Sequence, residues 1–122
     1  MKIALITIHN VPNYGAVLQA YASFRILSQY GRVYTINYQN PHLTHHMRLF
    51  RTERSLRGVM KLAHDILNFK YRRKMRNRFL HFIHEELNLT RPYTYDVLDA
   101  GDLEPFDCFV CGSDQIWNPQ IV

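Results

Sequence analysis

The sequence lacks a long hydrophobic run and is poor in cysteine. Only six apolar or small residues separate Lys2 from His9, which is too short for a signal sequence or a membrane span. The two cysteines, Cys108 and Cys111, stand three apart in a strand-like run, and there is no second pair to complete a zinc site. We therefore expect a cytoplasmic protein in which both thiols are small buried side chains without a metal or redox role.

Glycine is also scarce where a nucleotide-binding protein would need it. The turn after the first apolar run contains Gly15 alone and has no GxGxxG pattern. A generic nucleotide-binding Rossmann domain is therefore a weak alternative. A loop holds three further candidate metal ligands, His42, His45 and His46, but no acidic or cysteine partner lies near them in the sequence. We interpret them as ordinary loop histidines and expect no metal site.

What the sequence does contain fits one packed domain over residues 1–122, since 47% of its 122 residues are hydrophobic and 13% are aromatic. Its excess of basic residues is local: residues 45–78 hold eleven Lys or Arg against two acids. The densest part is KYRRKMRNR, from Lys70 to Arg78. It fits a solvated helix face whose arginine stems cover apolar surface, or contact with an anionic acceptor or membrane. Nucleic acid is not expected, because no recognition fold accompanies the charge.

Hydrophobic periodicity predicts an α/β fold with a short parallel sheet. A continuous apolar strand, Ile3–Ile8, precedes a helix from Gly15 to Tyr30 that Gly31 would stop, and a β-rich strand, Arg32–Tyr38, completes a βαβ unit. The run Ile3–Ile8 is apolar throughout, as in a parallel strand covered on both faces.

The second half of the chain predicts one long helical segment and one more strand. Ser55–Leu87 carries an apolar stripe at helical spacing, with Gly58 and Asn68 as weak points. Because an unbroken helix of that length would exceed what a small domain can cover, we expect a break or a partner surface. Leu89–Pro105 is expected to be loop with one helical turn, and Phe106–Cys111 is expected to be the third strand.

Two polar turns follow the first and last of these strands, at His9–Gln19 and at Gly112–Asn118. If the first strand lies between the other two, both turns open onto one crevice at the carboxyl ends of the strands. Amide, hydroxyl and aromatic groups there suit a polar, ring-shaped ligand such as a sugar. The alternative is purely structural: Asn13 is then only a helix cap, Gly15 a packing glycine and Trp117 part of the core.

The motifs HNVPNYGAVLQAYA and GSDQIWNP, with FLHFIHEELNLT at 79–90 between them, resemble the polysaccharide pyruvyl transferase family. The resemblance implies a GT-B-like enzyme of two Rossmann-type domains, which transfers pyruvate from phosphoenolpyruvate onto two sugar hydroxyls as a ketal in exopolysaccharide biosynthesis. Family members are much longer than this chain. We therefore expect it to be the Rossmann-like, three-layer N-terminal domain, half of that architecture, and inactive without a C-terminal domain or partner chain.

The resemblance also implies roles for individual residues. His9 is the candidate for acid–base catalysis, with no metal and no cofactor besides phosphoenolpyruvate as donor substrate. The candidate residues for binding the sugar or polysaccharide-precursor acceptor are Asn13, Tyr14, Gly15, Gln19, Ser113, Asp114, Gln115, Trp117 and Asn118. Independently of the resemblance, the charge of Lys70 to Arg78 allows contact with an anionic membrane surface, which would place the protein at the inner face of the membrane. The alternative function is a non-catalytic sugar-binding or interaction domain, a truncated relic of the enzyme.

Overall fold

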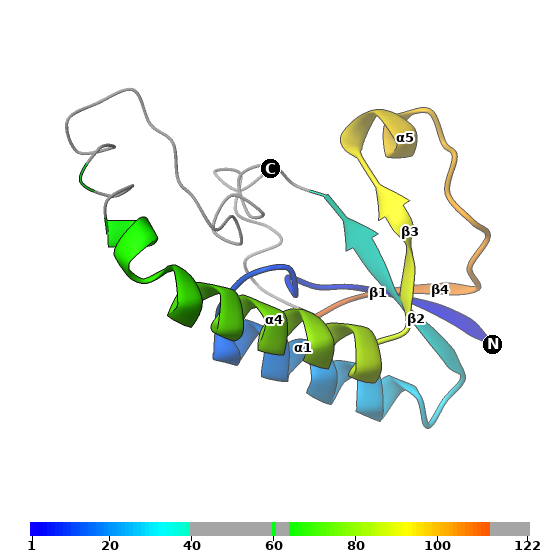
Figure 1. Ribbon diagram of the computed structural model, residues 1–122. Helices are drawn as coiled ribbons and strands as arrows, with labels where there is room; N and C mark the ends of the chain where they lie inside the picture. The colour runs from blue at the N-terminus through cyan, green and yellow to red at the C-terminus, as the bar shows by residue number, and fades with distance from the viewer. Residues whose placement is uncertain (40–59, 61–63, 113–122) are drawn as a thin grey trace.

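A computed structural model describes residues 1–39, 60 and 64–112, and its central feature is a four-stranded parallel sheet (Figure 1). The strands lie in the order β3-β2-β1-β4. The predicted α/β class is therefore confirmed. The elements are β1 (Lys2–Ile6), α1 (Tyr14–Leu27), β2 (Arg32–Tyr38), α4 (Phe69–Glu86), β3 (Leu89–Tyr93), α5 (Tyr95–Asp99) and β4 (Cys108–Cys111).

Strand β1 is central in the sheet and pairs in parallel with both β2 and β4. Ile3 lies opposite Val33 on one side and opposite Cys108 on the other. Ile3, Ala4 and Leu5 are all buried, as predicted for a strand covered on both faces. The order also confirms that β1 separates the other two predicted strands, so the turns that follow β1 and β4 lie at the same edge of the sheet.

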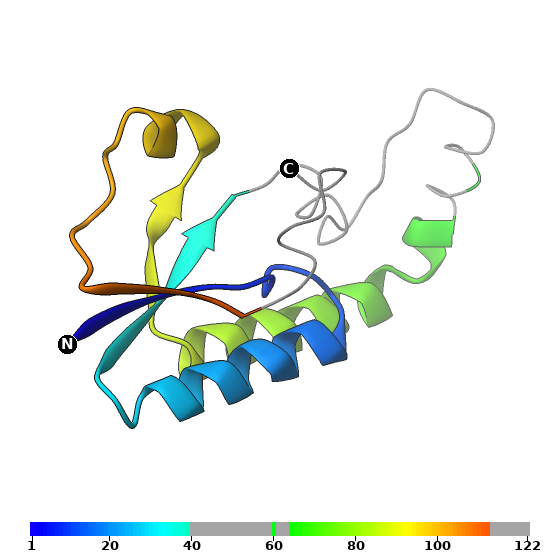
Figure 2. The same ribbon diagram turned by 180° about the vertical axis from the view of Figure 1, so that it is seen from behind.

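Helices α1 and α4 lie side by side on one face of the sheet (Figures 1 and 2). The sheet contributes a buried cluster around Ile3, Leu5 and Val33, against which Phe24 and Leu27 of α1 pack. The two helices share a second cluster, whose buried members are Val17, Ala20, Phe79, Ile83 and Leu87. Burial of this apolar surface is what holds α4 to the sheet layer through α1.

The opposite face of the sheet is covered by α5 and the chain that follows it. Ala4, Ile36 and Tyr93 are buried there beneath Val97, Leu98, Leu103 and Phe106. The fully buried Tyr93 hydroxyl accepts a hydrogen bond of 3.4 Å from the Glu104 amide. Both faces of the sheet are therefore covered, one by a pair of helices and the other by a thinner layer.

The sequence analysis missed strand β3, because Leu89–Pro105 was expected to be loop with one helical turn. The helical turn exists as α5, but Leu89–Tyr93 pairs with β2 at the edge of the sheet. Pro92 is acceptable there because an edge strand leaves one row of amides outside the ladder. An irregularity between Thr35 and Asn37 lets the Asn37 amide bond the Thr90 hydroxyl at 3.0 Å.

Helix α1 ends at Leu27, earlier than predicted, and Gly31 is not its stop signal. Ser28 is the C-cap, and its hydroxyl donates to the Phe24 carbonyl at 2.7 Å. A Cβ on Gly31 would lie 2.5 Å from the Met1 carbonyl oxygen. Gly31 is therefore required for the close approach of two backbones where β2 begins beside β1.

Helix α4 begins after a break at Asn68, one of the two predicted weak points. Gly58 and the first part of the predicted helix lie outside the described residues, as do His42, His45 and His46. The apolar stripe does not face the core throughout, because Leu67 and Tyr71 are 86% and 71% exposed. Only its later part, including Phe79, packs against α1.

Strands β1 and β4 differ from prediction in length, and the cysteines of β4 differ in burial. β1 ends at Ile6 rather than Ile8, and β4 begins at Cys108 rather than Phe106. The expectation that both cysteines are buried is wrong: Cys108 is half-buried and Cys111 is exposed, because β4 lies at the edge of the sheet. No helix among the described residues has the length and apolar character needed to cross a bilayer.

Candidate functional site

The turn after β1 is closed by the cap of α1. The Asn13 Oδ1 atom accepts hydrogen bonds from the amides of Gly15, at 2.9 Å, and Ala16, at 3.3 Å. A Cβ on Gly15 would lie only 3.3 Å from that oxygen, so the glycine leaves room for the cap. The predicted cap is thus confirmed, and it aims the first turn of α1 at the carboxyl edge of the sheet.

His9 lies inside this turn and is 2% exposed. Its Nδ1 atom is 3.1 Å from the Thr7 carbonyl oxygen. A carbonyl only accepts, so Nδ1 carries the proton and Nε2 keeps its lone pair in the neutral ring. Within the described part of the chain, the buried Nε2 has no hydrogen-bond partner.

The surroundings of His9 favour its neutral form. Burial lowers the pKa of His9 below its ordinary value, the hydrogen bond to Thr7 opposes this, and the charge of His84 lowers the pKa further. A histidine that is neutral at pH 7, with one nitrogen fixed as a donor, presents the other nitrogen as a proton acceptor. His9 therefore offers a proton acceptor at Nε2, an atom that is itself buried in the described part of the chain.

The structure joins β1 and α1 to Gly112, the first residue of the second polar turn. Its amide donates to the Ile6 carbonyl at 2.8 Å, and the Gln19 side-chain amide donates to the Gly112 carbonyl. A Cβ on Gly112 would contact Leu5 and Thr7 at 3.2 to 3.4 Å. Gly112 thus packs against the residue whose carbonyl holds the His9 ring. Ser113, Asp114, Gln115, Trp117 and Asn118 lie outside the described residues.

A cluster of side-chain amides at the same edge was missed by the sequence analysis. The Asn37 Oδ1 atom accepts from the Gln39 side chain at 2.6 Å and lies 3.5 Å from the Asn10 amide nitrogen. Asn37 stands near the carboxyl end of β2, and Asn10 follows β1. The signal available in the sequence was the pair of polar residues that ends an otherwise β-rich run, at Asn37 and Gln39.

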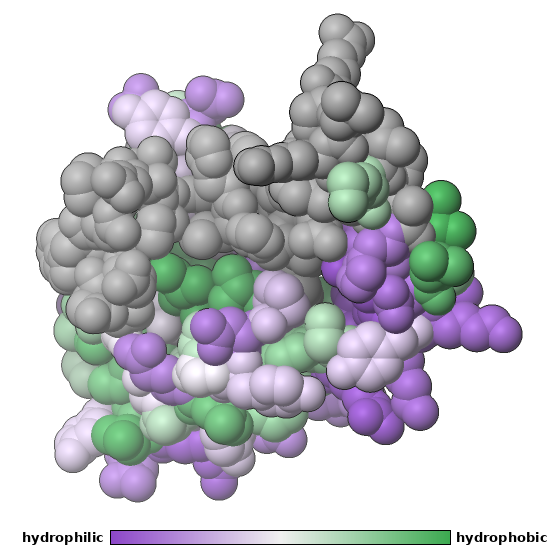
Figure 3. Space-filling view, turned by 90° about the vertical axis from the view of Figure 1, so that its left-hand side faces the viewer, coloured by the Kyte–Doolittle hydropathy of each residue, from purple (hydrophilic) through white to green (hydrophobic). Residues whose placement is uncertain are grey.

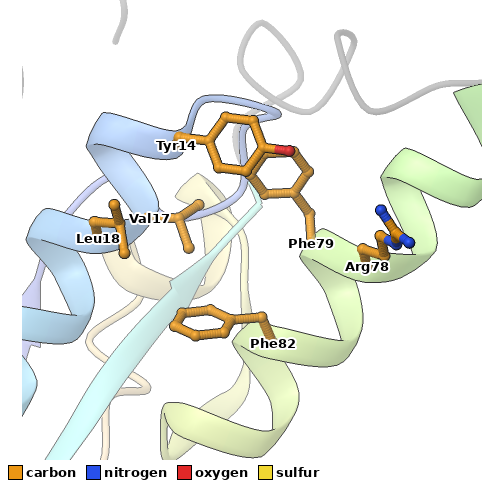
Figure 4. Close-up of a pocket in the computed structure, with 6 residues that line it drawn as sticks. All are labelled: Tyr14, Val17, Leu18, Arg78, Phe79 and Phe82. Atoms are coloured by element: carbon orange, nitrogen blue, oxygen red, sulfur yellow. The ribbon is translucent and has the colours of Figure 1, made fainter.

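Tyr14 is placed away from this amide cluster, in a groove between α1 and α4. Its ring packs on Phe79 with the ring centres 4.7 Å apart (Figure 4). The groove encloses about 290 Å³ and is lined by Tyr14, Val17, Leu18, Arg78, Phe79 and Phe82. Of the acceptor-side candidates that the structure describes, Gln19 contacts Gly112, Asn13 and Gly15 form the cap of α1, and Tyr14 packs between the helices.

Among the described residues, no three histidine, cysteine, aspartate or glutamate side chains are grouped as metal ligands would be. The polar groups that the fold gathers at the carboxyl edge are instead one histidine and several amides. Comparisons with protein families, with curated proteins and with solved structures gave no match for this chain.

Proposed function

We propose that this chain is the N-terminal, acceptor-side part of a polysaccharide pyruvyl transferase. The observation that supports this most is the position of His9, a buried neutral histidine whose Nε2 has no partner among the described residues, in the turn that meets Gly112 at the start of the second family-like motif. The amides of Asn10, Asn37 and Gln39 supply donors and acceptors for sugar hydroxyls at the same edge of the sheet.

In the proposed reaction, the methylene carbon of phosphoenolpyruvate gains a proton, and a sugar hydroxyl oxygen bonds to the neighbouring carbon. The C–O bond to phosphate then breaks, and a second hydroxyl of the same sugar bonds to that carbon to close the ketal. Two hydroxyl protons are released, one balancing the protonated methylene and one leaving on phosphate. His9 acts as the base that accepts a hydroxyl proton at Nε2.

The donor is assigned to a C-terminal domain or partner chain. Phosphoenolpyruvate carries several negative charges, and the described carboxyl edge offers only a neutral histidine and neutral amides. A binding site of this kind suits an uncharged hydroxyl-rich ring better than a phosphate, which is normally held by cationic side chains or a helix N-terminus. The first turn of α1 is already occupied by the Asn13 cap.

The test is phosphate release from phosphoenolpyruvate by the product of the whole reading frame that contains this sequence, with a panel of polysaccharide precursors as acceptors. We expect release that depends on one acceptor. His9→Asn keeps a donor for the Thr7 carbonyl but removes the base, and we expect it to lower the rate by about 10²–10⁴-fold. The matched control is His81→Asn, which changes an exposed histidine and leaves the rate unchanged.

Two results would contradict the proposal. Full activity of His9→Asn would remove His9 from the chemistry. Saturable binding of an acceptor without phosphate release, in the complete product and with every acceptor tested, would instead favour the non-catalytic sugar-binding domain.

A further inference from the structure

The outer face of α4 carries a row of exposed cations. Lys70, Arg73, Lys74 and Arg78 are all exposed, and within the part of the chain that the structure describes none of them forms an ion pair. With Phe69, Asn77 and His81 they line an open groove of about 660 Å³ along the helix. We call these four side chains the basic row.

The basic row is distinct from the arginines that serve the fold. Arg72 reaches Asp65, which is fully buried, with 3.3 Å between Nη1 and Oδ1. Arg76 is half-buried, with its Nε shielded from solvent. Arg72 and Arg76 therefore fit the interpretation in which arginine stems cover apolar surface. That interpretation gives the four residues of the basic row no structural role.

Apolar surface lies directly beside the basic row. Arg78 belongs to both grooves, since it also lines the apolar groove that contains Leu18 and Phe82 (Figure 4). Tyr14 and Leu18 are 70% and 56% exposed at this groove. Figure 3 views the end of the molecule where α1 begins, and there apolar and strongly hydrophilic side chains lie next to one another below the grey atoms.

We propose that this surface, the basic row with the adjoining Tyr14 and Leu18, binds the headgroup region of an anionic membrane. Helix α4 has 18 residues and so spans roughly 27 Å at 1.5 Å per residue, long enough to meet several lipid headgroups. Cations on one strip, with an aromatic ring and a leucine on the next, match the boundary between anionic headgroups and acyl chains.

Charge complementarity favours the membrane over the two other polyanionic partners. A nucleic acid would need base-stacking or groove-reading groups among the cations. Tyr14 packs against Phe79, and the exposed Tyr71 is not among the residues that line the groove of the basic row. An acidic protein surface would need no exposed leucine beside the cations. The proposal rests on the charge and exposure of α4 and not on pyruvyl transfer, so either one can fail without the other.

The test is cosedimentation of the full chain with vesicles, either of phosphatidylcholine alone or with about one third phosphatidylglycerol. Each Lys or Arg near an anionic surface contributes about 1 kcal/mol, which is about fivefold in partitioning. Arg73→Gln with Lys74→Gln should therefore weaken binding to the anionic vesicles by about 25-fold. Raising the salt from about 50 mM to about 500 mM should abolish most of the binding, because the Debye length shortens severalfold.

The matched control is Arg25→Gln with Arg32→Gln, which removes the same charge from exposed sites outside the basic row. It should retain binding within about twofold, because charges farther from the surface are screened. A second variant, Leu18→Ser, leaves the charge unchanged and should weaken binding severalfold by removing apolar insertion.

Three outcomes would overturn the proposal. These are equal binding to neutral and anionic vesicles, no binding to either kind, and equal losses in the basic-row and control variants. Displacement of the chain from anionic vesicles by an equal charge of single-stranded RNA, with tighter binding to the RNA than to the vesicles, would assign the basic row to nucleic acid instead.

Discussion

The buried His9 predicts a measurable dependence of stability on pH. Its pKa is lowered in the folded protein, chiefly by burial, while in the unfolded chain it titrates near its ordinary value of 6.5. Above that pH the ring is neutral in both states and contributes nothing to the pH dependence. Below pH 6.5 the unfolded chain binds a proton at His9 that the native chain does not bind, so the free energy of unfolding falls as the pH falls.

The size of the effect follows from one proton. Stability changes by at most about 1.4 kcal/mol per pH unit for each proton that only the unfolded state binds. Between about pH 7.5 and about pH 5.5, a group with an unfolded pKa of 6.5 and a lowered native pKa contributes at most about 1.4 kcal/mol in total.

The informative variant is His9→Asn, because asparagine donates from nearly the same position as Nδ1 to the Thr7 carbonyl and does not titrate. Urea unfolding followed by circular dichroism, at several pH values, gives the free energy of unfolding of both proteins. We expect the wild type to lose about 1 kcal/mol more than the variant between about pH 7.5 and about pH 5.5. Exposed histidines contribute equally to both proteins and cancel.

The same slope in both proteins would refute this reasoning. A direct check is the imidazole pKa of His9 from NMR titration. A value above 6.5 would show that the hydrogen bond to Thr7 outweighs burial, and that His9 is charged rather than poised as a base.

Three further changes can be measured by urea unfolding at one pH. Asn13→Ala removes the oxygen that accepts from two amides and should cost about 1 kcal/mol, whereas Asn13→Asp should retain most of the stability. Gly31→Ala places a methyl group 2.5 Å from the Met1 carbonyl oxygen and should cost about 1–3 kcal/mol. Phe79→Ala leaves a cavity in the interface of α1 and α4 and should lower the free energy of unfolding by about 3–5 kcal/mol. The control Leu18→Ala changes an exposed residue and should have little effect on it. Similar losses for Phe79→Ala and Leu18→Ala would contradict the proposed helix interface.

The parts of the fold that could be predicted are those where one local pattern determines the structure. The apolar run that begins at Ile3 is typical of a strand covered on both faces, and Asn13 before a helical pattern is typical of a cap. Strand β3 could not be predicted in this way. Arg91 and Pro92 interrupt its pattern, and the strand exists because β2 offers it an unpaired edge.

For the candidate site, the sequence predicted that two turns meet, and the structure shows which atoms join the first turn and β1 to Gly112, where the second turn begins. The Gln19 side chain and the Gly112 amide fix the junction, and no local signal specifies such a long-range pair. Asn37 was missed for a related reason. Its role depends on Asn10 and Gln39, which approach it only after β1 and β2 pair.

Helix α4 shows how one sequence pattern can serve two purposes that separate only in three dimensions. Its six Lys and Arg residues are indistinguishable as a run, yet Arg72 and Arg76 turn inward while the basic row stays in solvent. The inner side, through Phe79 and Ile83, fixes the helix against α1 and sets the distance from His84 to His9. Neutralising the basic row should therefore leave the pKa of His9 unchanged, because exposed charges are screened by solvent. Loosening the helix interface with Phe79→Ala should instead raise the pKa of His9, because water would then reach the buried ring.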